Sequence, residues 1–248
     1  MDAESTGETP ARFVILRDPP GPGWRLGTRN AVHLDGGEWP DLGFLRREKA
    51  RLKHLLVVAG TVDLTALNEL SELETLDLAA SSCSADALVL GAMPKLRSLR
   101  IWGGVPTEFT AGHSLRSLEI ESMPRGWRDV LAELPRLDAL SLAKPRSVPE
   151  YYPSSLRSLE LTSVTHWDRD VKALRGLGGL RILDLVGVRG MRDLRAFAEV
   201  SHLERLYAED CDELVSLDGP TLTPNARYLF VGRTPLRSSM PSRWDEPR

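Results

Sequence analysis

The heptapeptide SLRSLEI at residues 114–120 returns as SLRSLEL at residues 155–161, changed only in its last apolar residue. A repeated motif of this kind is typical of a chain that stacks copies of one small structural unit, because a unit that cannot bury its apolar side alone needs copies of itself as neighbours. The two heptapeptides therefore predict a repeat architecture.

Both heptapeptides contain the motif LxxLxL, if Ile, Val or Ala may replace its last leucine, and this motif occurs nine times. The copies begin at Leu52, Leu73, Leu96, Leu115, Leu137, Leu156, Leu180, Leu203 and, in degenerate form, Ala226. Successive copies are 19 to 24 residues apart, and leucine-rich repeats have periods of roughly 20 to 29 residues. Residues 52–234 thus resemble the leucine-rich repeat family, in its small stand-alone bacterial form.

The alternation of apolar and polar residues within the motif predicts a short strand. Its fourth and sixth residues, such as Leu159 and Leu161, point to the same side and face a common core. Strands formed by successive copies of the motif, stacked about 4.8 Å apart, would build a parallel sheet. We expect an α/β leucine-rich repeat solenoid, a horseshoe with the sheet on its concave face and short helices or 3-10 turns on its convex face.

The segments that connect successive copies of the motif fall into two kinds. Short helices are expected at 62–70, 128–134, 169–177 and 192–200, where an acidic residue near each start suits a helix N-terminus. Extended or 3-10 structure is expected at 102–114 and 143–155, because proline and glycine leave little room there for a helix.

One position departs from the family pattern. Three residues after the last strand leucine, the family commonly has an asparagine, or sometimes a cysteine, that satisfies the backbone of the turn. This chain has Ser81, Gly104, Met123, Pro145, Val164, Val188, Cys211 and Thr234 there. We therefore expect the backbone groups of these turns to bond to water or to one another.

Three regions are expected along the chain. Residues 1–50 form an N-terminal capping region, 51–234 the solenoid of about nine repeats, and 235–248 a flexible C-terminal tail. The capping region contains two plausible strands, 13–16 and 31–35, and a helix is expected within 38–52.

The composition argues against several classes of function. The 32 basic and 35 acidic residues nearly balance, so no strong net field favours nucleic acid or an anionic membrane. The chain shows neither a secretory signal nor a stretch apolar enough to span a bilayer. Two widely separated cysteines, Cys83 and Cys211, fit a reducing interior. A cytoplasmic location is expected.

No pattern of catalytic or metal-binding residues is evident. The five histidines lack metal-ligand spacing and are expected to be solvated or locally bonded. Cys211 occupies the turn position described above, which favours buried packing over a nucleophilic role. We therefore expect no enzymatic activity, no cofactor, no metal and no small-molecule substrate. An enzyme of unrecognised type is the third hypothesis.

The outward positions of the strands carry carboxylates at the centre and aromatic residues to either side. An ion-pair ladder of Asp77, Arg100 and Glu119 is the simplest explanation for part of this row. It does not explain Glu160 beside Asp184, nor the aromatic side chains. The predicted partner-binding residues are Arg100, Trp102, Glu119, Glu121, Glu160, Asp184, Tyr207, Glu209, Tyr228 and Phe230.

A mostly basic row lies beside these residues, one position after each leading leucine. It consists of Lys53, Glu74, Arg97, Arg116, Asp138, Arg157, Arg181, Glu204 and Arg227. Some of these arginines are expected to neutralise the carboxylates of the centre.

The acidic, aromatic surface is expected to bind a protein partner with basic and apolar groups. Nucleic acid is disfavoured because its phosphates would meet carboxylates, and no membrane partner is expected. Small solenoids of this family resemble immunity or antitoxin-like proteins, so inhibition of the partner is the specific hypothesis. The alternative is a regulatory or scaffolding adaptor that uses the convex side or the tail.

Overall fold

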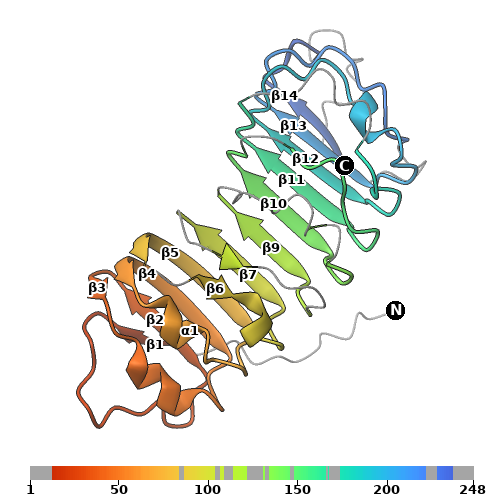
Figure 1. The fold of residues 1–248 in the computed structure, drawn as a ribbon. Coiled ribbons are helices and arrows are strands. Elements are labelled where there is room, and N and C mark those ends of the chain that lie inside the picture. Colours follow the sequence, from red (N-terminus) through yellow and green to blue (C-terminus); the bar gives the residue numbers. More distant parts are fainter. Residues whose placement is uncertain are drawn as a thin grey trace, which may run out of the picture.

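The computed structural model describes residues 13–83, 87–103, 107–108, 114–121, 131, 134–145, 148–165, 167, 174–221 and 228–236. Within these residues the chain forms a parallel solenoid of stacked repeats (Figure 1). Eleven strands follow one another along the sheet in sequence order, and β3 pairs with β4 off this path. The strands of the sheet are β1 (Phe13–Leu16), β2 (Ala31–Asp35), β3 (Glu38–Trp39), β4 (His54–Val62), β5 (Thr75–Cys83), β7 (Ser98–Trp102), β9 (Ser117–Ile120), β10 (Ala139–Ala143), β11 (Ser158–Thr162), β12 (Ile182–Val186), β13 (Arg205–Glu209) and β14 (Tyr228–Gly232).

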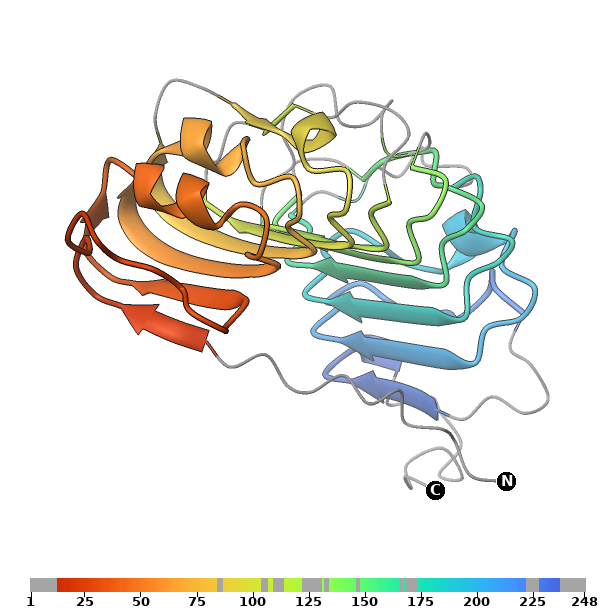
Figure 2. The same ribbon diagram turned by 90° about the horizontal axis from the view of Figure 1, so that it is seen from below.

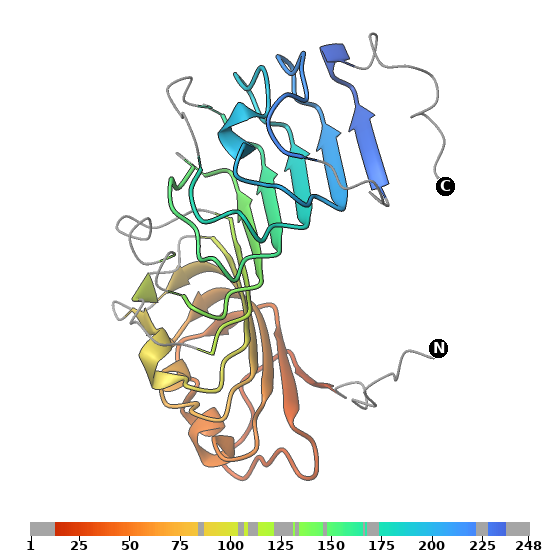
Figure 3. The same ribbon diagram turned by 90° about the vertical axis from the view of Figure 1, so that its right-hand side faces the viewer.

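The register places each repeat directly on the next. Leu159 of β11 lies opposite Leu140 of β10 and Leu183 of β12, and Leu161 lies opposite Leu142 and Leu185. All six side chains are at most 2% exposed. The predicted two-sided strand is confirmed, and Figure 3 shows β9 to β14 stacked side by side with a common direction.

The N-terminal segment extends the same sheet. The predicted strands at 13–16 and 31–35 are confirmed as β1 and β2, and Val32 and Leu34 lie opposite Leu55 and Val57 of β4. The helix expected within 38–52 is the 3-10 helix η1 (Gly43–Glu48). The boundaries of the three predicted regions stay a prediction, and 1–12 and 237–248 lie outside the described residues.

Helices in the described connections are short and few. The helix expected at 62–70 is α1 (Leu64–Leu67), capped by Asp63, whose carboxylate accepts a hydrogen bond from the amide of Thr65. The segment 192–200 contains only the 3-10 helix η3 (Arg195–Phe197). A connection that must return within one short repeat has room for a tight turn of 3-10 geometry more readily than for a full helix.

Other expected elements are only partly described. Most of 128–134 and of 169–177 lies outside the described residues. Within 102–114 the expected extended structure is present at β8 (Thr107–Glu108), which pairs with β6 (Leu88–Val89) just before the 3-10 helix η2 (Leu90–Ala92). In Figure 2 the sheet bends into an arc, with the strands on its inner side and the described helices on its outer side.

A left-handed residue follows directly after most described strands of the repeats. In four of these turns the backbone N–H of that residue donates to the last carbonyl of the next strand, as in Lys144 to Thr162 at 2.7 Å and Ser163 to Val186 at 2.7 Å. The amide of Gly103 donates instead to the carboxylate of Glu121. The residues with this conformation and their φ angles are Gly103 (91°), Lys144 (49°), Ser163 (55°), Gly187 (64°), Asp210 (54°) and Arg233 (46°).

Neighbouring repeats therefore satisfy these turns, without an asparagine ladder. The residue after each left-handed position occupies the place where the family commonly has asparagine. Val164, Val188 and Cys211 are fully buried there, so the position adds apolar volume to the core.

Replacing Leu159 with alanine should lower the free energy of unfolding by about 2–5 kcal/mol, because it opens a cavity between neighbouring repeats. Urea denaturation would measure the loss. Ser141→Ala, on the other side of the sheet, should change the same quantity by less than about 0.5 kcal/mol. Equal losses in the two variants would contradict the assignment of the two faces.

The left-handed turns predict a pair of opposite effects. Ser163→Gly should raise the free energy of unfolding by up to about 1 kcal/mol, because glycine relieves the strain of a positive φ. Gly187→Ala should lower it by about 1 kcal/mol, although an added Cβ would meet only ordinary contacts, the nearest at 3.6 Å. Shifts of the same sign in both variants, measured by chemical denaturation, would refute this account.

Candidate interaction surface

The face of the sheet that points away from the core is called the open face. Its central row takes one residue from each strand, and backbone register brings these residues side by side across neighbouring strands. In order they are Ile15, His33, Leu56, Asp77, Arg100, Glu119, Ser141, Glu160, Asp184, Tyr207 and Phe230. Six predicted partner-binding residues thus share this row, namely Arg100, Glu119, Glu160, Asp184, Tyr207 and Phe230.

The charged side chains in the N-terminal half of the central row are paired with one another. The guanidinium of Arg100 lies 2.6 Å from Glu119 and 3.5 Å from Asp77. The hydrogen bond to Glu119 is the main reason that the pKa of Arg100 is raised. The ion-pair ladder expected from the sequence is therefore confirmed. One guanidinium serves two carboxylates, so the ladder keeps one negative charge in excess, but each carboxylate has a cationic partner.

An apolar hollow of about 220 Å³ adjoins this ladder. Trp102, 38% exposed, forms one side of it, and Val58, 43% exposed, lies on the same row of the sheet. The hollow is lined by Leu56, Val58, Asp77, Leu78, Ala79, Arg100 and Trp102. Trp102 thus offers an apolar surface next to a cluster of paired charges.

Glu121 supports a turn as well as facing the open side. Its carboxylate accepts a hydrogen bond from Lys144 at 2.6 Å and another from the amide of Gly103 at 3.1 Å. The bond to Lys144 is the first cause of its lowered pKa, and the bond to Gly103 is the second. Glu121 is therefore already occupied by contacts within the protein.

Glu160 and Asp184 lie directly opposite each other on β11 and β12. Asp184 forms an ion pair with Arg205 at 3.1 Å. Its pKa is nevertheless raised, first by partial burial and also by the charge of Glu160, against the opposing effect of Arg205. For Glu160 the described residues provide a hydrogen bond from Thr162 at 3.3 Å and no ion pair.

The aromatic residues of the C-terminal half form a stack. The rings of Tyr207 and Phe230 are 4.8 Å apart and nearly parallel, and the ring of Tyr228 is also nearly parallel to that of Tyr207, with the centroids 6.5 Å apart. The guanidinium of Arg205 lies 5.4 Å from the centre of the Tyr228 ring. Tyr207 and Phe230 are half-buried by this packing, whereas Tyr228 is 38% exposed.

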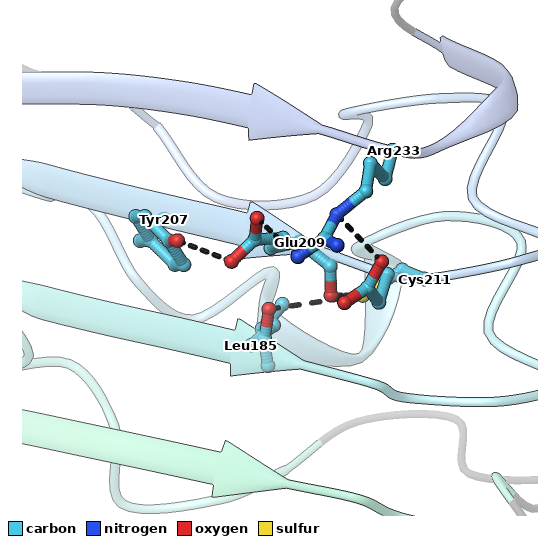
Figure 4. Close-up of polar contacts among 6 residues, drawn as sticks. Leu185, Tyr207, Glu209, Cys211 and Arg233 are labelled. Carbon is cyan, nitrogen blue, oxygen red and sulfur yellow. Dashed lines mark hydrogen bonds and ion pairs between the residues drawn. The ribbon is translucent and has the colours of Figure 1, made fainter.

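Glu209 links the aromatic stack to the turn after β13 (Figure 4). It accepts a hydrogen bond from the hydroxyl of Tyr207 at 2.5 Å and pairs with Arg233 at 2.7 Å. Both contacts lower its pKa, that of Tyr207 the more. Arg233 also reaches Asp210 at 2.9 Å, so this corner has few unsatisfied charges.

Cys211 is part of the core, as expected from its turn position. Its side chain is fully buried, and its Sγ lies 3.5 Å from the carbonyl of Glu209 and 3.8 Å from that of Leu185 (Figure 4). Burial raises the pKa of the thiol. Its thiol is therefore kept from solvent and from the thiolate form.

Sequence reasoning missed Arg205, which neutralises Asp184 and packs on Tyr228. A signal for it was present. Arg205 is the first residue of its strand, and the first residue is small or hydroxylated in five earlier strands, where it is Thr75, Ser98, Ser117, Ala139 or Ser158. An arginine in such a row points to a specific partner. Arg233, beyond the strand, had no comparable signal.

Two of the histidines fit the expectation of local bonding. His54 Nδ1 lies 3.0 Å from the hydroxyl of Thr75, and His202 Nδ1 lies 2.7 Å from that of Ser201. His33 differs, because its Nε2 is buried without a hydrogen-bond partner. His113 and His166 lie outside the described residues.

Over the described ranges, no group of three or more histidine, cysteine, aspartate or glutamate side chains is placed to hold a metal ion. A search of the same ranges for a helix long and apolar enough to cross a membrane also finds none. No model of a known protein family matches the chain, and no curated protein sequence matches it. Function is therefore inferred from the chain's own residues.

The contact between Tyr207 and Glu209 predicts an altered titration. This hydrogen bond is the main reason that the pKa of Tyr207 is raised to about 12. Glu209→Gln should move that pKa back toward about 10, as followed by NMR of the tyrosine rings. The contribution of the bond to folding stability should be present below about pH 10 and disappear as the pH rises through about 12.

Glu204→Gln is the matched control, because Glu204 pairs with Arg181 at 3.2 Å and is not among the groups that shift the Tyr207 pKa. It should leave the titration of Tyr207 unchanged. An unchanged titration in Glu209→Gln would contradict the assigned role of this carboxylate.

Proposed function

We propose that this chain is a leucine-rich repeat protein of the horseshoe type that binds a protein partner through the open face and has no enzymatic activity. The repeat period of 19 to 24 residues supports this assignment, as does the continuous parallel register of the strands. Repeat solenoids commonly use their extended curved surfaces for binding.

The observation that carries the proposal is the acidic pair of Glu160 and Asp184. Like charges directly opposite each other on neighbouring strands are unfavourable, and Arg205 balances only one of the two. A lysine or arginine of a partner, placed beside Glu160, would remove the imbalance. Both carboxylates are half-buried, so an ion pair there would be less screened by water than one on an open surface.

Apolar groups flank this acidic centre on both sides. Trp102 lies toward the N-terminal end, and the stack of Tyr207, Tyr228 and Phe230 lies toward the C-terminal end. Exposed aromatic side chains are frequent anchors of protein interfaces. A partner with a basic residue between two apolar groups would match this arrangement, and the phosphates of a nucleic acid would be repelled.

The specific form of the proposal is a bacterial, cytoplasmic inhibitor of the immunity or antitoxin kind. The open face runs along the whole sheet from β1 to β14, which suits a protein that neutralises a partner by covering it. Both thiols are free, in keeping with a reducing compartment.

Glu160→Lys should strongly weaken binding to the partner while the protein stays folded, because the new cation would face Asp184 and repel the basic residue of the partner. Affinity capture with quantitative mass spectrometry would identify the proteins retained by the native chain. Calorimetry with the purified partner should then show a loss of affinity of about thirtyfold or more, as expected for a half-buried charge pair, on the order of 2 kcal/mol or more.

Glu69→Lys is the control, because Glu69 is exposed on the segment that follows α1 and pairs with Arg46 away from the open face. It should retain every partner. If the partners of the native chain bind Glu160→Lys equally well, the proposed face is wrong. If removal of residues 235–248 abolishes their binding instead, the result favours the hypothesis of an adaptor that binds through its tail.

A further inference from the structure

Strands β5, β7, β9 and β10 begin along one edge of the sheet (Figure 1), and a second group of charged residues lies at this edge. A hollow of about 250 Å³ opens there. Its lining residues are Glu74, Pro94, Lys95, Arg97, Ser114, Arg116 and Arg136. It is called the arginine hollow below, and it is distinct from the open face.

The repeat itself brings the arginines of the hollow together. Arg97 and Arg116 occupy the same position in successive repeats, and the amide of Arg116 donates to the carbonyl of Arg97 at 2.7 Å. Arg136 lies in the turn that leads into β10. Adjacent strands are about 4.8 Å apart, so the backbone holds the two stems of Arg97 and Arg116 close to each other.

Arg97 and Arg116 belong to the basic row one position after each leading leucine, and other basic residues of that row have partners within the protein. Lys53 pairs with Glu74 at 2.7 Å, Arg181 pairs with Glu204 at 3.2 Å, and Arg157 donates to the carbonyl of Gly179 at 3.2 Å. For Arg97, Arg116 and Arg136, by contrast, no ion pair or side-chain hydrogen bond occurs among the described residues.

The remaining charges of the hollow are already committed. Glu74 is held by Lys53, and this hydrogen bond is the first cause of its lowered pKa, to which the charge of Arg97 contributes less. Lys95 pairs with Glu72 at 2.5 Å. These contacts leave an excess of positive charge on the three guanidinium groups, which repel one another unless an anion lies between them.

We propose that the arginine hollow binds a phosphate group. A guanidinium presents several N–H donors in a rigid planar fork that matches the oxygens of phosphate, and such charge-assisted bonds are stronger than neutral ones. A hollow of this size holds a tetrahedral anion together with a small substituent. The phosphate belongs to a free anion or to a phosphate monoester, and both present the same doubly charged oxygens.

The test is isothermal titration calorimetry with inorganic phosphate and with phosphoserine, at constant ionic strength set with chloride. The native chain should bind at least one of the two saturably, and the difference between them identifies the source. Arg97→Gln and Arg116→Gln should each weaken binding by about tenfold or more, as expected for loss of a hydrogen bond between charged groups. Arg116→Lys should also weaken it, because the charge remains but the fork is lost.

Arg181→Gln is the matched control, since Arg181 occupies the same repeat position but has Glu204 as its partner. It should bind phosphate as the native chain does. Thermal unfolding provides a second measurement, in which phosphate raises the midpoint of the native chain and of Arg181→Gln but not of the double variant Arg97→Gln with Arg116→Gln. Absence of saturable binding to either anion, or equal weakening in Arg181→Gln, would overturn the proposal.

Discussion

Each described strand along the main path of the sheet carries two apolar side chains, two residues apart, that must meet the same pair on the neighbouring strand. Leu159 and Leu161 do so with the leucines of β10 on one side and of β12 on the other. A slip of one residue would turn both side chains into solvent. Burial therefore sets the register of the whole sheet, and the connections are free to vary in length and composition.

The same register arranges the opposite face. Residues between the buried leucines become neighbours across strands, so the open face consists of rows rather than of scattered side chains. Arg100 lies between Asp77 and Glu119 for this reason, and Glu160 lies beside Asp184. Surface ion pairs contribute only about 0 to 1 kcal/mol each. The fold does not depend on them, and an unbalanced carboxylate such as Glu160 can be tolerated.

The turns and the edge of the sheet show the same principle. A left-handed residue such as Ser163 or Gly187 turns the chain after the strand, and its amide bonds to the next repeat. Each repeat thus satisfies the backbone of its neighbour, and Val164 or Val188 fills the core where a polar side chain would otherwise be needed. The edge where the strands begin brings Arg97 and Arg116 together by the same stacking.

The sequence by itself determined the strands, their parallel order and the side of each strand that is buried, because period and alternation are local properties of the chain. It also identified the central row of the open face and the ladder around Arg100. The partners of the other charges were decided only by the tertiary structure. Arg205 reaches Asp184 and Arg233 reaches Glu209 from neighbouring repeats, and these contacts depend on side-chain direction and length. The left-handed turns were likewise not predictable from residue type, because lysine, serine, aspartate and arginine adopt them under the constraint of the stacked strands.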